Sequence, residues 1–235
     1  DESSAASDVY KRQALAIGSE AYRRFGNMDR AIELTIRATQ RVMASFSQKE
    51  ATINCREVTH CDFSSKWSFT KYFLSGRFLH CFTLAQQWAP DAIEAAESGL
   101  DALGTSSKEG EISWKNSVNC ASLVVQKLGA TEEEMVMVAG FAGGLGLSGG
   151  GCGALSAAIW MRSLSWCRKN DRKNSFKHIE AARTLKAFDK VSKGRILCSE
   201  LCGQSFETIT DHNKFIRQGG CAHIIQALSE LDSTS

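Results

Sequence analysis

Proline is almost absent from this sequence, which has one among 235 residues, and runs that alternate apolar and polar residues are few. Alternation with a period of two is the pattern of a half-buried β-strand, and proline interrupts regular helices. Both shortages favour helices along the whole chain. We therefore predict an all-α fold, with a core that the hydrophobic content of 43% is sufficient to build.

An excess of charge of one sign is also lacking, because 28 Lys and Arg residues stand against 26 Asp and Glu, a net charge of +2. This balance argues against a protein specialised for nucleic acid or for a membrane surface. The sequence as given opens with no signal peptide. We expect the cytoplasm or the interior of an organelle, a mitochondrion or a plastid, rather than secretion.

Cysteine, by contrast, is plentiful, with nine residues in the chain. They are spread out, unlike the dense cysteines of a small secreted disulfide scaffold. In a reducing compartment such thiols stay free, so metal binding and redox chemistry both become candidate roles.

One uncharged stretch, residues 135–161 (MVMVAGFAGGLGLSGGGCGALSAAIWM), holds eight of the nineteen glycines and has Cys152 near its centre. Glycine costs backbone entropy on folding, roughly 0.5–1 kcal/mol per residue relative to alanine. A run this dense therefore indicates that the backbone approaches another group closely. We predict a buried glycine loop between two helices, which delivers Cys152 to the start of the second.

Three other interpretations of this stretch have less support. Residues 144–149 fit the dinucleotide fingerprint and residues 146–150 fit the nucleophile elbow, but both need a preceding strand in a sheet, and strand-like runs are few. The length would suffice for a membrane span, yet the glycines and serines make a poor lipid-facing helix. We expect no membrane span.

Composition divides the chain into four segments. Residues 1–13 are polar and aperiodic, and we interpret them as a leader or a non-native junction. Residues 104–110 (GTSSKEG) are a predicted linker between helical units at 14–103 and 111–235. Within these units helices are expected at 14–25, 29–46, 64–89, 90–103, 111–128, from 131, 153–168, 174–192 and 211–231.

The two units show an internal repeat. Residues 53–58 (INCREV) align with residues 196–201 (ILCSEL), and Cys81 and Cys221 follow further along at comparable spacings. Several matches in the same order indicate duplication, with a partial first repeat and a complete second one.

The repeat carries two expectations. Residues 14–100 should superpose on residues 154–231. The first repeat begins where its own counterpart of Cys152 is due, so we also expect the natural protein to extend upstream with another glycine-rich, cysteine-bearing segment.

Four short motifs occur in a fixed order in the second unit: Asn119-Cys120-Ala121, Gly151-Cys152-Gly153-Ala154-Leu155, Cys198-Ser199-Glu200-Leu201 and Cys221-Ala222. This order resembles a family of redox-active proteins named for its cysteine pattern, C–GCAxxG–C–C. The resemblance covers about residues 112–231, with a half match over 14–100. Ala157 departs from it, because it stands where the motif's last glycine is expected.

The resemblance implies a redox function. A related domain occurs in split-Soret cytochromes, which suggests electron transfer and an iron–sulfur cluster, although the chain has no haem-attachment CxxCH. Four thiolates suit an iron–sulfur cluster or a closed zinc site. The candidate ligands are Cys120, Cys152, Cys198 and Cys221, which are expected to converge. Thiol–disulfide chemistry and structural burial remain alternatives for the same four residues.

Other residues have supporting roles in this interpretation. Gly150, Gly151 and Gly153 could donate backbone N–H groups to the sulfurs of a cluster, and the helix start at Cys152 should lower the pKa of its thiol. We assign three further cysteines to burial as small hydrophobic residues: Cys61, Cys167 and Cys202. No catalytic residue is assigned.

The predicted function is that of a soluble helical redox protein, which binds a metal or iron–sulfur centre or transfers electrons through thiols. The competing hypothesis is a structural or accessory subunit of a larger complex that keeps a redox-derived fold. The expected partner is a redox protein or a larger protein complex, with a homo- or hetero-oligomer open and no nucleic acid.

Overall fold

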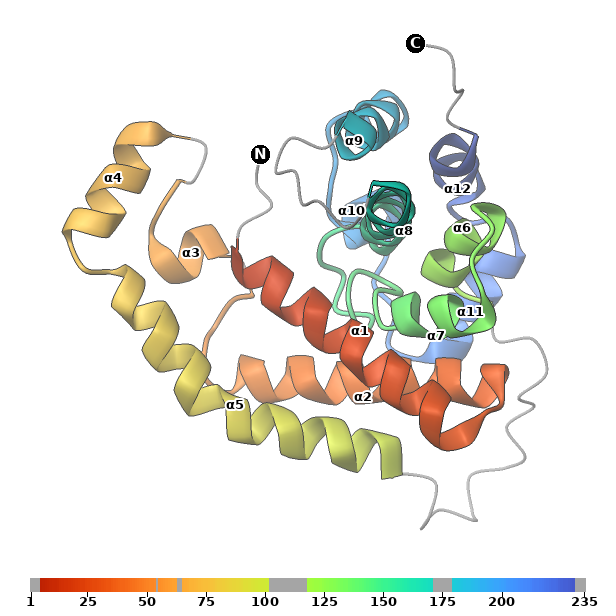
Figure 1. Cartoon of the computed structure of the whole chain (residues 1–235), viewed down its shortest axis with the longest axis horizontal. Coiled ribbons are helices and arrows are strands. Elements are labelled where there is room, and N and C mark those ends of the chain that lie inside the picture. The colour runs from red at the N-terminus through yellow and green to blue at the C-terminus, as the bar shows by residue number, and fades with distance from the viewer. Residues whose placement is uncertain (1–4, 54, 63–64, 102–117, 171–178, 231–235) are drawn as a thin grey trace.

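The chain is built from helices (Figure 1). The computed structural model describes residues 5–53, 55–62, 65–101, 118–170 and 179–230. Over these ranges there is no strand, only an isolated bridge between Gly151 and Leu197, so the predicted all-α fold is confirmed. The helices are α1 (Ala5–Phe25), α2 (Met28–Ser47), α3 (Cys55–Thr59), α4 (Lys66–Leu74), α5 (Phe78–Asp101), α6 (Cys120–Lys127), α7 (Glu132–Ala139), α8 (Gly153–Lys169), α9 (Ile179–Ser192), α10 (Cys198–Cys202), α11 (Ile209–Arg217) and α12 (Ala222–Ser229).

Several boundaries differ from the expected ones. The helix expected over 64–89 is interrupted between α4 and α5, and the helix expected over 211–231 is interrupted between α11 and α12. The first helix starts at Ala5, so it includes most of the segment interpreted as a leader. Pro90 was expected to begin a helix, but it lies inside α5. There it lacks the N–H that would bond to the carbonyl one turn back, a defect that an exposed position tolerates because water can solvate that carbonyl. The predicted linker at 104–110 falls outside the described residues.

Helix α2 is the centre of the first half of the molecule. It begins at the cap residue Asn27, whose side-chain oxygen accepts a hydrogen bond from the backbone N–H of Arg30 at 2.9 Å. Helices α1, α5 and α7 all pack on it. Its buried residues include Ile32, Leu34 and Ile36. Burying one such side chain stabilises the folded state by roughly 1.5–3 kcal/mol, so the apolar side chains of α2 hold helices α1, α5 and α7 together.

Helix α5 meets α2 at very close range through its C-terminal half. A Cβ atom added at Gly99 would overlap the backbone of Ala38, so only glycine allows this approach. Further along α5, Trp88 stacks edge-on against Phe46 with ring centroids 5.1 Å apart, and its indole N–H donates to Ser45 Oγ at 3.0 Å. The C-terminal half of α5 is thereby anchored to the core.

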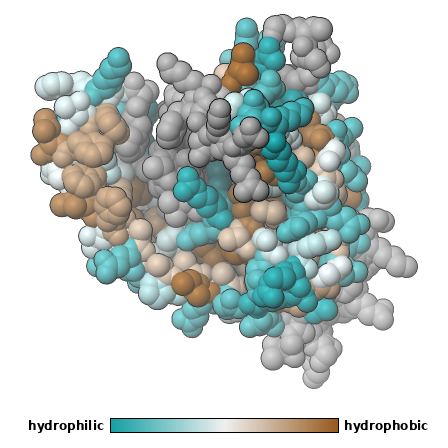
Figure 2. All heavy atoms as spheres, in the orientation of Figure 1, coloured by the Kyte–Doolittle hydropathy of each residue, from teal (hydrophilic) through white to brown (hydrophobic). Residues whose placement is uncertain are grey.

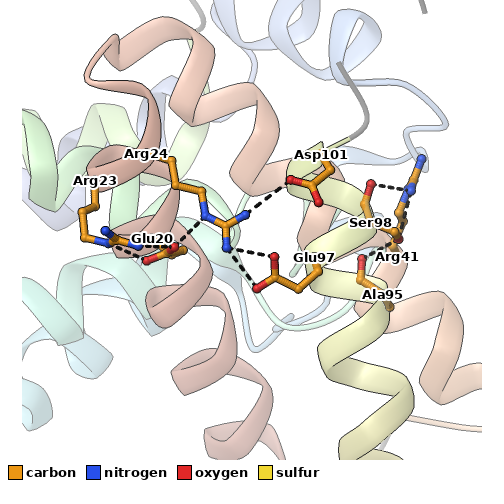
Figure 3. A network of polar contacts seen from close by, with 8 residues as sticks. All are labelled: Glu20, Arg23, Arg24, Arg41, Ala95, Glu97, Ser98 and Asp101. Carbon is orange, nitrogen blue, oxygen red and sulfur yellow. Dashed lines mark hydrogen bonds and ion pairs between the residues drawn. The ribbon is translucent and has the colours of Figure 1, made fainter. Parts of the chain in front are cut away.

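A polar network joins the ends of α1 and α5 at the surface (Figure 3). Arg24 bonds to Glu20 on its own helix and reaches across to Glu97 at 2.8 Å and to Asp101 at 3.4 Å. Hydrogen bonds from Arg23 and Arg24 lower the pKa of Glu20 to about 2. Exposed pairs of this kind contribute little stability, so the network orients the two helices more than it stabilises them.

The second half of the molecule has its own core. Helix α8 packs on α6 and α9, and α12 closes the group by contacting α6, α8 and α9. Val124, Ile224 and Leu228 are fully buried there. Met28, Leu145 and Phe215 contact both this core and the core around α2, so the two halves share an interface.

In the described part of the chain, no helix combines the length and the apolar character needed to cross a bilayer. The superposition of residues 14–100 on residues 154–231 stays a prediction.

A buried histidine should make stability depend on pH. His212 of α11 is 1% exposed, its Nδ1 atom has no hydrogen-bond partner, and its ring stands edge-on to Phe206. Burial lowers the pKa of His212 from 6.5 to about 4. The folded state therefore binds a proton at His212 less well than the unfolded state does. The folded protein is most stable with respect to this residue above pH 6.5, where His212 is neutral in both states, and it loses stability as the pH falls toward 4.

We expect the free energy of unfolding of the unmodified protein to fall by about 1–3 kcal/mol between pH 7 and pH 5 through this residue. Chemical denaturation at several pH values measures the effect. The matched control is His212→Phe, which keeps an aromatic ring but does not titrate. Equal pH slopes for the two proteins would contradict the prediction.

Candidate functional site

The glycine-rich stretch begins directly after α7. That helix starts with a capping box, in which Thr131 Oγ1 accepts from the N–H of Glu134 and the Glu134 carboxylate accepts from the N–H of Thr131. It ends at Ala139, and residues 140–147 continue as a series of turns. Bonds such as Gly146 N–H to the Gly140 carbonyl, at 2.8 Å, hold the turns together.

Close backbone contact explains two of the glycines in these turns. A Cβ atom at Gly146 would lie 2.8 Å from the backbone nitrogen of Gln40 in α2, and the φ angle of +58° is one that side chains disfavour. A Cβ atom at Gly144 would lie 2.5 Å from the Gly150 carbonyl oxygen and 2.9 Å from Cys198 Cβ. The stretch is therefore packed between α2 and the cysteine at the start of α10.

The end of the glycine stretch pairs with the segment that leads into α10. Cys152 N–H donates to the Ile196 carbonyl at 2.9 Å, and Cys198 N–H donates to the Gly150 carbonyl at 2.7 Å. Ser199 adds two bonds to the Gly149 carbonyl, from its N–H and its Oγ, both at 3.2 Å. This pairing brings Cys152 and Cys198 together although 46 positions separate them in the sequence (198 − 152).

Cys152 is the residue that precedes α8; its side chain makes no capping hydrogen bond, but the backbone N–H groups of Leu155 and Ala154 act to lower the pKa of its thiol. The sequence predicted that this helix start would lower the pKa of the thiol. The outcome is the opposite, because Cys152 is 7% exposed and burial raises its pKa to about 11. The N–H groups reduce the rise but do not reverse it.

Three cysteines form a chain of neighbouring sulfur atoms. Cys198 Sγ lies 3.8 Å from Cys202 Sγ, and Cys202 Sγ lies 3.5 Å from Cys221 Sγ. Cys198 and Cys202 occupy positions i and i+4 of α10, so they share one face of that helix. Cys221 precedes α12 with a φ angle of +60°, an uncommon backbone conformation for a residue with a side chain.

The pKa values of these thiols follow from their contacts. The hydrogen bond with Cys198 raises the pKa of Cys202 to about 12, and burial adds to this effect while Cys221 partly opposes it. The hydrogen bond with Cys202, together with burial, raises the pKa of Cys221 as well. Both thiols are therefore protonated at neutral pH.

Cys120 completes the group from α6. Asn119 caps this helix by accepting from the N–H of Ser122 at 2.9 Å, and Cys120 itself is buried. Burial raises the pKa of Cys120, and negative charge on Cys152, Cys221 or Cys202 would raise it further. Cys120 therefore lies within electrostatic reach of Cys152, Cys202 and Cys221.

The structure places Cys120, Cys152 and Cys221 in the core of the second half of the molecule and Cys198 in the core around α2, so the convergence of all four sulfurs stays a prediction. The structure also places Cys202, which the sequence analysis had assigned to simple burial, beside Cys198 and Cys221. The spacing Cys-x-x-x-Cys within α10 was the available signal, because it places two thiols on one helix face.

The remaining cysteines lie elsewhere. Cys61 is buried and accepts a weak hydrogen bond from Ser68 Oγ at 3.7 Å. Cys167 lies near the C-terminal end of α8 and is half-buried. In the first half of the chain, Cys81 Sγ lies 3.1 Å from the Tyr72 hydroxyl, while the side chain of Cys55 is outside the described part.

The sulfur atoms of Cys198, Cys202 and Cys221 have part of the geometry that a metal ion requires. The separations of 3.5 and 3.8 Å resemble the edge of about 3.8 Å between two thiolates on one zinc ion, given zinc–sulfur bonds of about 2.3 Å. Among the residues that the structure describes, however, no three His, Cys, Asp or Glu side chains are arranged to hold a metal ion. As placed, the thiols do not form a metal site.

Residues 117–231 match the family model described as "Putative redox-active protein (C_GCAxxG_C_C)". Searches of the curated proteins and of the solved structures each found no significant match.

Two neighbouring glycines provide a matched test of this geometry. A Cβ atom added at Gly153 would overlap the Phe141 carbonyl, whereas one added at Gly151 would meet nothing within 4 Å. We expect Gly153→Ala to destabilise the protein by about 1–3 kcal/mol, because the start of α8 must move away from the loop. Gly151→Ala should change stability by less than about 0.5 kcal/mol. Thermal unfolding of both variants measures the difference, and equal effects would show that the close contact is not required.

Proposed function

We propose that this chain, whose residues 117–231 match the model of the C_GCAxxG_C_C family, transfers electrons by forming and breaking a disulfide between Cys202 and Cys221. The observation that carries the proposal is the separation of 3.5 Å between their sulfur atoms. A disulfide bond measures about 2.05 Å, so the two sulfurs need to approach by roughly 1.5 Å.

Position and exposure favour this pair over the others. Cys202 and Cys221 are half-buried, while Cys120, Cys152 and Cys198 are buried. Cys198 and Cys202 belong to one short helix, whose backbone directs the two Cβ atoms along its axis rather than toward each other. Cys221 precedes a different helix, α12, so its side chain is not bound to the geometry of α10.

The reaction requires an oxidant, which is a disulfide of a partner protein or of a small thiol. The Cys202 thiolate attacks one sulfur of that disulfide, which forms a mixed disulfide and releases the first partner thiolate. The Cys221 thiolate then attacks Cys202 Sγ, which closes the internal disulfide and releases the second partner thiolate. Two electrons pass to the partner, and the two protons from Cys202 and Cys221 end on its thiols. A partner dithiol reverses both steps.

Two further functions were expected from the sequence and remain proposals. An iron–sulfur or zinc centre would use the same cysteines, with Cys120, Cys152, Cys198 and Cys221 as ligands and Gly150, Gly151 and Gly153 beside them. A structural subunit of a larger complex would use the cysteines only for packing. Each function gives a different result in a single experiment on anaerobically purified protein.

In that experiment, we expect oxidised glutathione to convert the protein to a form with one internal disulfide, which a reductant reverses. Peptide mass mapping should locate the bond between Cys202 and Cys221, and elemental analysis should find less than one iron or zinc per chain. Cys221→Ser should prevent formation of the internal disulfide. Cys167→Ser is the matched control, because Cys167 lies outside the group, and it should oxidise normally.

Other results would favour the competing functions. Stoichiometric iron or zinc that is lost in Cys152→Ser but not in Cys167→Ser would establish a metal centre. Absence of both metal and reversible oxidation would establish a structural role for the cysteines.

The raised pKa values give a second prediction. Attack by a thiol proceeds through the thiolate, so we expect the rate of alkylation of Cys202 by iodoacetamide to rise about tenfold per pH unit from pH 7 to pH 10. Cys198→Ala should raise this rate at pH 8, because it removes the hydrogen bond that raises the pKa of Cys202 to about 12. A rate that levels off near pH 8 would contradict the assigned protonation state.

A further inference from the structure

A large apolar surface remains uncovered at the edge of the molecule formed by α4 and the start of α5 (Figure 2). Its exposed side chains are Trp67, Phe69, Phe73, Leu74, Leu79 and Phe82, and we refer to them together as the aromatic knob. Leu74 is 84% exposed and Trp67 is 78% exposed, which is unusual for residues of this size. An apolar patch of this extent indicates an interaction surface.

The aromatic knob is continuous rather than scattered. Phe73 contacts Phe69 with ring centroids 5.1 Å apart, and it stacks on Phe78 at 5.2 Å with the planes inclined by 22°. Phe78 in turn contacts Phe82 at 6.3 Å. These ring contacts hold α4 against the start of α5, so the two helices present one ordered surface.

The shape of this region is a protrusion. No described helix packs extensively against α4, which lies at the far end of the molecule from α12 (Figure 1). Trp88 fixes the middle of α5 to α2 and Gly99 fixes its C-terminal half, while the start of α5 carries the aromatic knob outward. A convex surface of this kind cannot enclose a small ligand, but it can insert into a larger binding partner.

The segment that carries the aromatic knob contains basic residues and no acidic one, while Glu50 and Asp62 of the preceding segment contact it at His80 and Ser68. Residues 65–90 contain Lys66, Lys71 and Arg77 and no Asp or Glu, although the whole chain is nearly neutral. All three basic side chains are exposed beside the aromatic knob. A second copy of the chain docked through this face would bring like charges together, which disfavours a symmetric dimer.

We propose that the aromatic knob binds the surface of an anionic lipid bilayer. Aromatic and leucine side chains enter the boundary between headgroups and acyl chains, and basic residues beside them are attracted to anionic headgroups. The exposed fractions, the convex shape and the charge of +3 within residues 65–90, from Lys66, Lys71 and Arg77, all match this ligand. The thiol chemistry plays no part in this inference.

The test is cosedimentation of the full chain with lipid vesicles. Binding is expected to vesicles that contain phosphatidylserine together with phosphatidylcholine, to weaken as salt is added, and to be much weaker with phosphatidylcholine alone. The double variant Trp67→Gln, Leu74→Gln should lower the partition coefficient at least about tenfold. Lys71→Gln should lower it about fivefold.

Matched controls come from the other half of the molecule. Ile179 in α9 is an exposed apolar residue and Lys127 in α6 an exposed basic one, both outside the knob. Ile179→Gln and Lys127→Gln should bind vesicles like the unmodified protein. Because Trp67 and Leu74 are largely exposed, their replacement should leave thermal unfolding unchanged, which separates loss of binding from loss of fold.

Three results would overturn the proposal. The protein could fail to sediment with anionic vesicles, or the double variant could bind them as well as the unmodified chain. Light scattering could instead reveal a dimer that Leu74→Gln dissociates, which would identify the knob as a contact between two copies.

Discussion

The candidate site depends on one interaction, the backbone pairing of residues 149–152 with residues 196–199. Two of its bonds, from Cys152 N–H to Ile196 and from Cys198 N–H to Gly150, join the residues that precede α8 to those that precede α10. The pairing also requires glycine at position 144, because a Cβ atom there would collide with the backbone of Gly150. The glycines are therefore required for backbone contact, and the position of the thiols is a consequence of that contact.

Burial then determines how the thiols behave. The backbone N–H groups at the start of α8 stabilise a thiolate on Cys152, yet the loss of water around the sulfur has the larger effect and its pKa rises. At Cys202 the hydrogen bond with Cys198 acts in the same direction, and the hydrogen bond with Cys221 partly opposes it. A group of protonated thiols reacts slowly with disulfides in general. Rapid exchange then requires a partner that exposes Cys202 or removes its proton, so docking and not intrinsic reactivity would select the partner.

The sequence was sufficient to predict the fold class and the order of the four cysteine motifs, and the family match over residues 117–231 agrees with the latter. A helix is held by hydrogen bonds between residues four positions apart, so the scarcity of proline and the helical periodicity of the sequence are sufficient to predict it. The sign of the pKa shift at Cys152 could not be predicted in this way, because it depends on how α6, α10 and α12 close over the sulfur. The place of Cys202 was missed because burial was weighed residue by residue, without the face that Cys198 and Cys202 share on α10.

Composition averaged over the chain also hid a local asymmetry. A net charge of +2 suggested no membrane-surface role, but residues 65–90 carry three basic side chains and no acidic one. The acidic residues that balance them lie outside this segment: Glu50 contacts it at His80, and Glu97 and Asp101 are bound by Arg24. Electrostatic attraction to a surface falls off within about 10 Å at moderate ionic strength, so the charge next to the aromatic side chains matters and the total does not. The core of the second half and the projecting end of the first are thus separate features, because the helices that position the thiols contribute nothing to the exposed aromatic surface.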